Sequence, residues 1–313
     1  MTRGAVLRLA AAGVLLAVVI HFAHPRSLAE ALLRADRDWL IAGFAAAVLS
    51  NVFSALRWRA LTVWLGASVS RRFAVLTYFK AMALNALLPG AVIGGDVFRA
   101  ITLRRAGLPS LDAGVSVLLD RSSGLWILLV VGSAAAPFAA QSLHVAQPGP
   151  FVLVSLLGAI LPPLLLIAPL WLVAGPSTRV LRGRRVAALA RVQALMRRAN
   201  ALRQYGLQVA ASLLVQALSI GALACCGCAL DLDLPSAVWA AASAPVFLMA
   251  ALPVSFGGWG TREAAAAAVL SIFGVPVEQA VGTAMLYGVF GLAQAALGCV
   301  LLTWRPLPLS SAG

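Results

Sequence analysis

Long apolar runs separated by short polar segments make up most of the chain. About six of these runs approach the roughly 20 residues that a helix needs to cross a bilayer. They lie near residues 5–23, 39–56, 112–135, 151–174, 205–229 and 279–303. The pattern predicts an all-α polytopic membrane protein in which residues 1–313 form a single transmembrane domain.

Two further apolar runs are each interrupted by a proline that is followed by paired glycines. Pro89 and Gly94–Gly95 break the first run, and Pro253 and Gly257–Gly258 break the second. In both, an arginine follows four residues after the second glycine. Proline ends a helix, and non-helical backbone at membrane depth persists only where it is buried in protein or lines a cavity. Each run is therefore predicted to form a broken helical hairpin.

Arginine pairs flank the first broken run on both sides. Arg71–Arg72 precedes it and Arg104–Arg105 follows it, so a full crossing would place one pair outside. We therefore expect a re-entrant hairpin that enters from the cytoplasm and returns to it. The order of span, hairpin and span recurs with opposite orientation, which predicts an inverted repeat of residues 39–135 and 205–303. Paired broken helices in inverted halves indicate a central transport site.

Charge supports a membrane protein and fixes its expected orientation. Only 11% of the residues are charged, against about 25% in soluble domains. Arginine supplies almost all of the net charge of +14, since Lys80 is the only lysine. The positive-inside rule and anionic lipid account for this excess, so no nucleic-acid partner is expected. Arg3 and Arg8 at the start of the first span and Arg305 after the last predict a multi-pass protein of the bacterial inner membrane with both termini cytoplasmic.

Two arginine-rich segments are expected on the cytoplasmic side. The tripeptide Arg57–Arg59 has the composition of the interfacial end of the second span. Segment 176–203 carries eight arginines and no acid, which predicts an amphipathic helix along the inner leaflet. The arginines of Arg179–Arg203 would contact anionic lipids and contribute about 1 kcal/mol each. The alternative is a solvated loop that only fixes the orientation of the chain.

The two glycine pairs are candidate anion-binding positions. Because glycine lacks a side chain, the backbone amides of Gly94–Gly95 and Gly257–Gly258 can approach a ligand closely. A helix that starts at each pair would direct its positive end toward the membrane centre. Arg99 and Arg262 follow about one turn later and could hold the same anion in a bidentate contact. The alternative is that the glycines only allow close packing of helices.

Three carboxylates accompany these arginines. Asp96 and Glu263 could pair with them, bind a cationic headgroup or carry a proton. Asp120 and Arg121 form a further charged pair inside a span, where charge is costly and usually marks a pathway, although a helix-packing ion pair is the alternative. Adjacent helical residues point about 100° apart, so these two should not pair with each other. Asp96 or Arg99 are the expected partners on other helices.

The remaining sequence holds little that could carry catalysis. Three histidines lie away from the broken motifs, and no Ser-His-Asp set, metal-spaced cluster or Walker motif is present. The segment Cys225–Cys228 has no further ligand at zinc spacing, so packing is the expected role of its cysteines. We therefore expect no catalytic residue, no metal and no cofactor. The substrate-binding candidates are Asn85, Gly94, Gly95, Asp96, Arg99, Asp120, Arg121, Ser255, Gly257, Gly258, Arg262 and Glu263.

Three motifs together resemble the lysylphosphatidylglycerol synthase transmembrane-region family. They are Leu-Pro-x4-Gly-Gly-Asp-x2-Arg at 88–99, Asp120-Arg121 within a span, and Leu-Pro-x-Ser-x-Gly-Gly-x-Gly-x-Arg-Glu at 252–263. The family commonly has Glu-Arg where this chain has Asp-Arg, which keeps the charge. The resemblance covers nearly the whole chain and implies the flippase-like half of the family without its lysyltransferase domain.

The sequence thus favours a lipid transporter that uses no ATP. We expect translocation of a lipid with an anionic or zwitterionic headgroup, and a phospholipid or other amphipathic lipid as the partner. The alternative is an integral-membrane enzyme or accessory subunit of lipid or glycolipid synthesis, such as a hopanoid or aminoacyl-lipid pathway. A scaffold that recruits partners through its basic segment is a third hypothesis. The lipid, the coupling ion and a homo-oligomeric state stay open.

Overall fold

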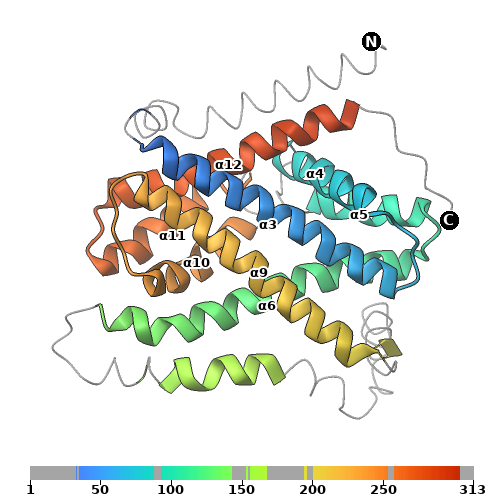
Figure 1. The fold of residues 1–313 in the computed structure, drawn as a ribbon, viewed down its shortest axis with the longest axis horizontal. Helices are drawn as coiled ribbons and strands as arrows, with labels where there is room; N and C mark the ends of the chain where they lie inside the picture. The colour runs from blue at the N-terminus through green and yellow to red at the C-terminus, as the bar shows by residue number, and fades with distance from the viewer. Residues whose placement is uncertain are drawn as a thin grey trace.

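The computed structural model describes residues 35–87, 93–142, 156–167, 200–252 and 257–303, together with positions 33, 153, 194 and 195. Within these ranges every regular element is a helix and none is a strand, which confirms the all-α prediction (Figure 1). The predicted span at 5–23 lies outside the described residues. So does most of the predicted basic helix at 176–203.

Four long apolar helices confirm a polytopic membrane protein. They are α3 (Arg37–Trp64), α6 (Ser110–Ala140), α9 (Ala201–Cys228) and α12 (Val277–Thr303). Each has the length and hydropathy that a bilayer crossing requires. They match four of the predicted spans. A shorter apolar helix, Leu156–Ile167, falls within the predicted span at 151–174.

Both broken hairpins are present as pairs of shorter helices. The first comprises α4 (Arg71–Leu87) and α5 (Ile93–Arg105). The second comprises α10 (Ser236–Ala251) and α11 (Thr261–Leu270), which a single 3-10 turn, η1 (Ser271–Phe273), extends. The two prolines that predict the breaks lie just beyond the described ends of α4 and α10.

The helices form two groups of four, α3 to α6 and α9 to α12, and the two groups pack in the same pattern. α3 packs along α9, α4 packs on α12 and α10 packs on α6. Within each group the hairpin helices pack on each other, and α5 contacts α6 as α11 contacts α12. Figure 1 shows the α4–α5 hairpin on one side of the crossing α3–α9 pair and the α10–α11 hairpin on the other.

Glycines allow the close contacts between each hairpin and the long helix of the other group. A Cβ at Gly298 of α12 would lie 2.2 Å from the carbonyl oxygen of Phe79 in α4. A Cβ at Gly132 of α6 would lie 2.7 Å from the Cβ of Ala244 in α10. Small residues let helix backbones approach in a membrane, where van der Waals contact replaces the hydrophobic effect as the driving force.

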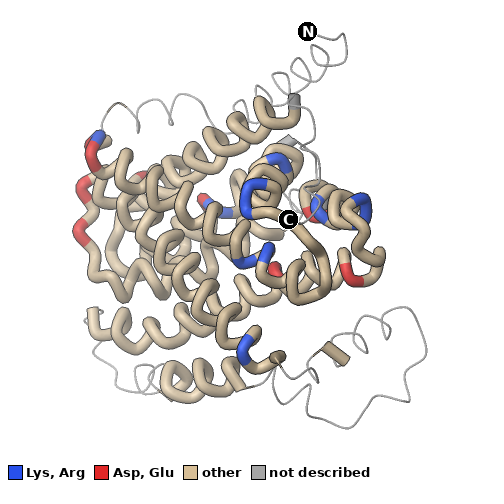
Figure 2. Tube along the Cα trace, turned by 45° about the vertical axis from the view of Figure 1, so that its right-hand side comes forward, with Lys and Arg blue, Asp and Glu red and all other residues tan. Residues whose placement is uncertain are grey.

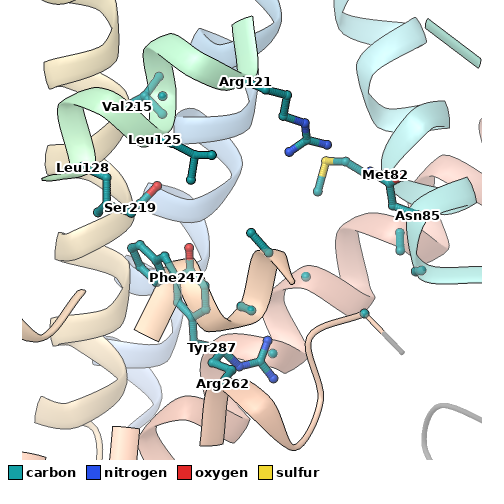
Figure 3. Close-up of a pocket in the computed structure, with 18 of the residues that line it drawn as sticks. Met82, Asn85, Arg121, Leu125, Leu128, Val215, Ser219, Phe247, Arg262 and Tyr287 are labelled. Atoms are coloured by element: carbon teal, nitrogen blue, oxygen red, sulfur yellow. The ribbon is translucent and has the colours of Figure 1, made fainter. Parts of the chain in front are cut away.

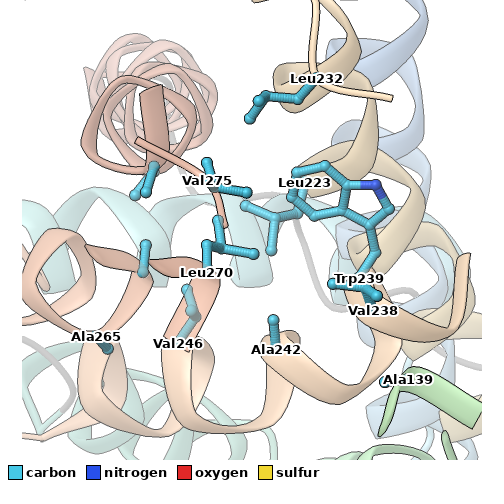
Figure 4. Close-up of a cluster of buried hydrophobic side chains, with 13 residues drawn as sticks. Ala139, Leu223, Leu232, Val238, Trp239, Ala242, Val246, Ala265, Leu270 and Val275 are labelled. Atoms are coloured by element: carbon cyan, nitrogen blue, oxygen red, sulfur yellow. The ribbon is translucent and has the colours of Figure 1, made fainter. Parts of the chain in front are cut away.

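A buried apolar cluster fixes the second hairpin against α9 (Figure 4). Trp239 of α10 is almost fully buried and covers Gly227 of α9, where a Cβ would meet the indole ring at 2.2 Å. Leu223 and Leu232 pack beside this ring, and Leu270 joins from the end of α11. The cluster therefore holds α10 and α11 as a unit next to the C-terminal half of α9.

Exposed acidic residues gather at one end of the molecule and exposed arginines gather at the other (Figure 2). One end carries five acidic residues, at the start of α3, after α9 and at the start of α12: Asp36, Asp38, Asp231, Asp233 and Glu278. The opposite end carries a group of exposed arginines: Arg71, Arg72, Arg104, Arg105 and Arg203. The α4–α5 hairpin begins and ends at the basic end, and the α10–α11 hairpin begins and ends at the acidic end.

This arrangement predicts which positions share a side of the membrane. In a variant whose four cysteines are replaced by alanine, single cysteines at the exposed positions Ser68 and Ser110 should react with an impermeant maleimide from the same side. Cysteines at Ser142 and Ser236, also exposed, should react from the other side. The measurement is labelling of right-side-out and inverted vesicles. Labelling of Ser68 and Ser110 from opposite sides would contradict a re-entrant first hairpin.

Candidate functional site

The carboxylate of Asp120 lies at the centre of a buried ion cluster. Asp120 on α6 is 1% exposed. Its Oδ1 accepts from Nε and Nη2 of Arg57 at 3.1 and 2.9 Å, and its Oδ2 accepts from Nη1 of Arg99 at 2.7 Å. Arg57 belongs to α3 and Arg99 to α5. A buried charge is tolerated only where partners satisfy it, so this carboxylate ties three helices together.

Arg57 is a member of this cluster that sequence reasoning missed. The expectation of an interfacial Arg57–Arg59 segment is wrong for its first two residues, because Arg57 is 6% exposed and Trp58 is fully buried. Arg57 also donates from Nη1 to Oγ of Ser212 on α9 at 2.9 Å. The available signal was the apolar pattern after Arg59, which continues α3 as far as Trp64.

Arg99 is enclosed and paired with two carboxylates rather than open to a ligand. It is 1% exposed, and its Nη2 donates to Oδ1 of Asp96 at 3.0 Å in addition to the contact with Asp120. Its guanidinium carbon lies 5.0 Å from the ring centroids of both Trp58 and Tyr78. Such cation–π contacts stabilise a desolvated arginine.

Arg121 pairs with Asp96 and not with its neighbour Asp120. Its Nε donates to Oδ2 of Asp96 at 2.9 Å, and its Nη2 donates to Oδ1 at 3.0 Å. This confirms the prediction that the adjacent residues Asp120 and Arg121 find Arg99 and Asp96 as partners across the helix contact. The side chain of Arg121 is 37% exposed, so it is the open member of the cluster.

The two Gly-Gly pairs meet different structural requirements, close helix packing in the first and left-handed backbone angles in the second. A Cβ at Gly95 would lie 2.3 Å from the carbonyl oxygen of Ala81, so this glycine permits close contact between α5 and α4. Its N–H donates to Oδ1 of Asn85 at 2.7 Å, which joins the two helices near the hairpin tip. By contrast, Gly257 and Gly258 have φ values of 58° and 83°, a left-handed conformation that favours glycine.

Arg262 and Glu263 form the charged pair of the second hairpin, in the first turn of α11. Nε and Nη2 of Arg262 donate to Oε1 of Glu263 at 3.1 and 2.5 Å. Oε2 of Glu263 accepts from the N–H of Gly260 at 2.6 Å, which caps the helix. The guanidinium carbon of Arg262 lies 4.8 Å from the ring centroid of Trp259.

A cavity of about 540 Å³ separates the tips of the two hairpins (Figure 3). Arg121 points into it from α6, Asn85 and Met82 lie on the α4 side, and Arg262 lies on the opposite wall. The remaining wall is mostly apolar, with Leu125, Leu128, Val215, Phe247, Trp259 and Leu292, and with polar atoms from Gln216, Ser219 and Tyr287.

Some of the predicted site residues line this cavity, and others do not. The predicted residues that line it are Asn85, Asp120, Arg121, Gly257 and Arg262. Those that do not are Gly94, Gly95, Asp96, Arg99, Gly258 and Glu263, and Ser255 lies outside the described residues. Besides Arg57, sequence reasoning missed Gly288, where a Cβ would lie 2.1 Å from Nη2 of Arg262. Among the described residues, no group of three or more metal-ligating side chains is positioned to hold an ion.

The buried cluster predicts a large loss of stability when Asp120 loses its charge. The Asp120→Asn substitution should lower the free energy of unfolding by about 3–5 kcal/mol, because it removes the carboxylate that the buried Arg57 and Arg99 share and leaves Arg99 with Asp96 alone. Asp38→Asn, at an exposed position in the first turn of α3, should cost less than about 1 kcal/mol. Both can be measured by denaturant titration of the purified protein in detergent. Equal stability of the two variants would contradict a structural role for the cluster.

A protein-family model matches nearly the whole chain. The model of the lysylphosphatidylglycerol synthase TM region matches residues 5–298. Among curated proteins, the comparison finds no match. The matched segment contains both hairpins, the ion cluster and every residue that lines the cavity. The chain therefore belongs to the lysylphosphatidylglycerol synthase TM region family.

Proposed function

We propose that this protein translocates a lipid with an anionic or zwitterionic headgroup across the bacterial inner membrane. The observation that carries the proposal is the cavity between the hairpin tips, which arginines from both halves of the chain line. Its volume of about 540 Å³ lies in the range of small-molecule sites, about 300–1,000 Å³. Arg121 and Arg262 would hold the headgroup there, and the apolar wall would contact the upper part of the acyl chains.

The opposite orientation of the hairpins supports transport. One hairpin reaches the cavity from the basic end and the other from the acidic end. Inverted halves with broken helices at a central site are typical of transporters that expose the site to each side in turn. By the positive-inside rule the basic end faces the cytoplasm, which places the α4–α5 hairpin on the inner side.

The ion cluster would define which helices move together. Asp120 links α3, α5 and α6, and Arg57 extends this link to α9 through Ser212. Breaking these contacts inside a membrane is costly, so the four helices would move as one body. The second hairpin is joined to α9 mainly by apolar packing, which can slide at a smaller cost. Motion of α10 and α11 relative to the cluster would then open the cavity.

The proposal predicts that displacing one arginine slows transport. Gly288→Ala should push the guanidinium of Arg262 aside, because a Cβ there would lie 2.1 Å from its Nη2, and the ring of Trp259 at 3.0 Å must shift slightly as well. Arg262→Ala should slow transport by about tenfold or more, since it removes charge-assisted hydrogen bonds to the headgroup. The measurement is dithionite quenching of a fluorescent phosphatidylglycerol in proteoliposomes.

Two matched variants serve as controls. Gly221→Ala fills open space on α9 away from the cavity, and Arg37→Ala removes an exposed charge at the start of α3. Both should keep the wild-type rate. A wild-type rate no faster than that of protein-free vesicles would reject transport and favour the alternative role in lipid synthesis. Equal rates for wild type and Arg262→Ala would reject the site.

A further inference from the structure

We infer that the outer face of α5 binds the phosphate of an anionic phospholipid at a site outside the cavity. Arg104 and Arg105 would hold the phosphate, and Val97 and Ile101 would contact an acyl chain. None of the described residues of α5 lines the cavity. Binding at this face therefore does not require that the cavity takes a lipid.

One face of α5 is buried in the protein, and the opposite face is exposed. Arg99 and Leu103 are at most 1% exposed, whereas Val97 and Ile101 are 49% and 39% exposed. Ile101 follows Val97 by four residues, which places the two on the same side of the helix. Acyl chains are as apolar as these side chains, so the exposed face of α5 suits contact with lipid tails.

Two arginines end this exposed face. Arg104 and Arg105 follow Ile101 by three and four residues, which places them one turn further along the same side. Both are exposed, and α5 ends at Arg105. An arginine at the end of an apolar helix face extends its guanidinium to the level of the lipid headgroups. A phospholipid beside α5 would thus present its phosphate to the arginines and a chain to Ile101.

The arginines at the open end of the first hairpin are not neutralised by the part of the chain that the structure describes. Arg71 and Arg72, at the start of α4, are exposed like Arg104 and Arg105. Among the described residues, these four side chains make no ion pair. Asp112, the next acid along the chain, is only 5% exposed. Four like charges without an exposed acid form a positive surface that attracts anions.

Neither helix stability nor orientation alone explains this surface. Arg71 and Arg72 occupy the first turn of α4, where the positive end of the helix dipole disfavours a cation. The positive-inside rule explains on which side of the membrane the arginines lie. It predicts no preference of α5 for one lipid over another, so a measured preference would distinguish a binding site from an orientation signal.

The apolar part of the face favours a lipid over a soluble acidic partner. At a rise of about 1.5 Å per residue, Val97 lies about 10 Å along the helix axis from Arg104. A soluble protein could reach the arginines, but it would not contact side chains inside the hydrocarbon layer. A phospholipid contacts both because its phosphate and its chains are joined. The bound lipid would hold the open end of the hairpin at the headgroup level.

Quenching by brominated lipids in nanodiscs tests the site. In the full-length protein with its four cysteines replaced by alanine, a bimane label is attached through Val97→Cys. A second sample carries it through Leu213→Cys, at a position 42% exposed in the middle of α9. The discs contain phosphatidylcholine and phosphatidylglycerol, and one of the two carries bromine on its chains at a fixed mole fraction.

We expect brominated phosphatidylglycerol to quench the label at Val97 at an at least about fivefold lower mole fraction than brominated phosphatidylcholine. This value corresponds to about one arginine's gain near an anionic headgroup. At Leu213 the two lipids should quench alike. Equal quenching at Val97, or the same preference at Leu213, would overturn the inference. A soluble acidic partner as the true occupant would give the first of these results.

Substitutions locate the contact and separate it from the cavity. The double variant Arg104→Gln/Arg105→Gln should lose the preference at Val97, and Arg104→Lys/Arg105→Lys should largely keep it. Arg37→Gln, exposed at the start of α3, and Arg121→Gln, in the cavity wall, should both keep it. A preference that survives the double Gln substitution would overturn the inference, whether or not the protein transports lipid. Absence of transport with the preference intact would reject the proposed function alone.

Discussion

The buried carboxylate of Asp120 constrains the arrangement of four helices. A charge in the interior of a membrane protein is costly unless donors surround it. Arg57 from α3 and Arg99 from α5 supply those donors, and Ser212 of α9 holds Arg57 in turn. These helices therefore have little freedom to rotate or slide. Because Arg121 follows Asp120 directly, the same constraint directs Arg121 toward the cavity.

Similar sequence motifs use glycine in different ways at the two hairpin tips. At Gly95 the missing side chain provides space between α4 and α5, which Asn85 then bridges. At Gly257 and Gly258 the chain needs left-handed backbone angles before α11 can start. The first tip is therefore held by a helix-to-helix hydrogen bond, whereas the second is a turn capped by Glu263. The packing of the halves is alike, but their tips differ in detail.

The cavity depends on a second difference between the two halves, at the residue that faces each hairpin arginine. If α12 carried an acid opposite Arg262, as α6 does opposite Arg99, Arg262 would bind a second carboxylate besides that of Glu263. Gly288 instead leaves the guanidinium of Arg262 against a bare helix backbone and beside the cavity. The first half supplies Arg121 from α6, and the second half supplies Arg262 from α11. Arg57 of α3 also lines the cavity, so the first half contributes two arginines and the second half one, and the repeat does not relate α6 to α11.

The sequence by itself determined the long spans, the two broken hairpins and the separation of Asp120 from Arg121. These follow from hydrophobic length, from proline and glycine, and from the 100° turn between helical neighbours. Only the tertiary structure decided that Arg57 is buried. In the sequence, an arginine beside a tryptophan does not distinguish a position at the membrane interface from a buried one that pairs with a carboxylate. The tertiary structure also decided that Arg121, and not Arg99, reaches the cavity. That choice depends on which faces of α5 and α6 pack together, and neither helix encodes it alone.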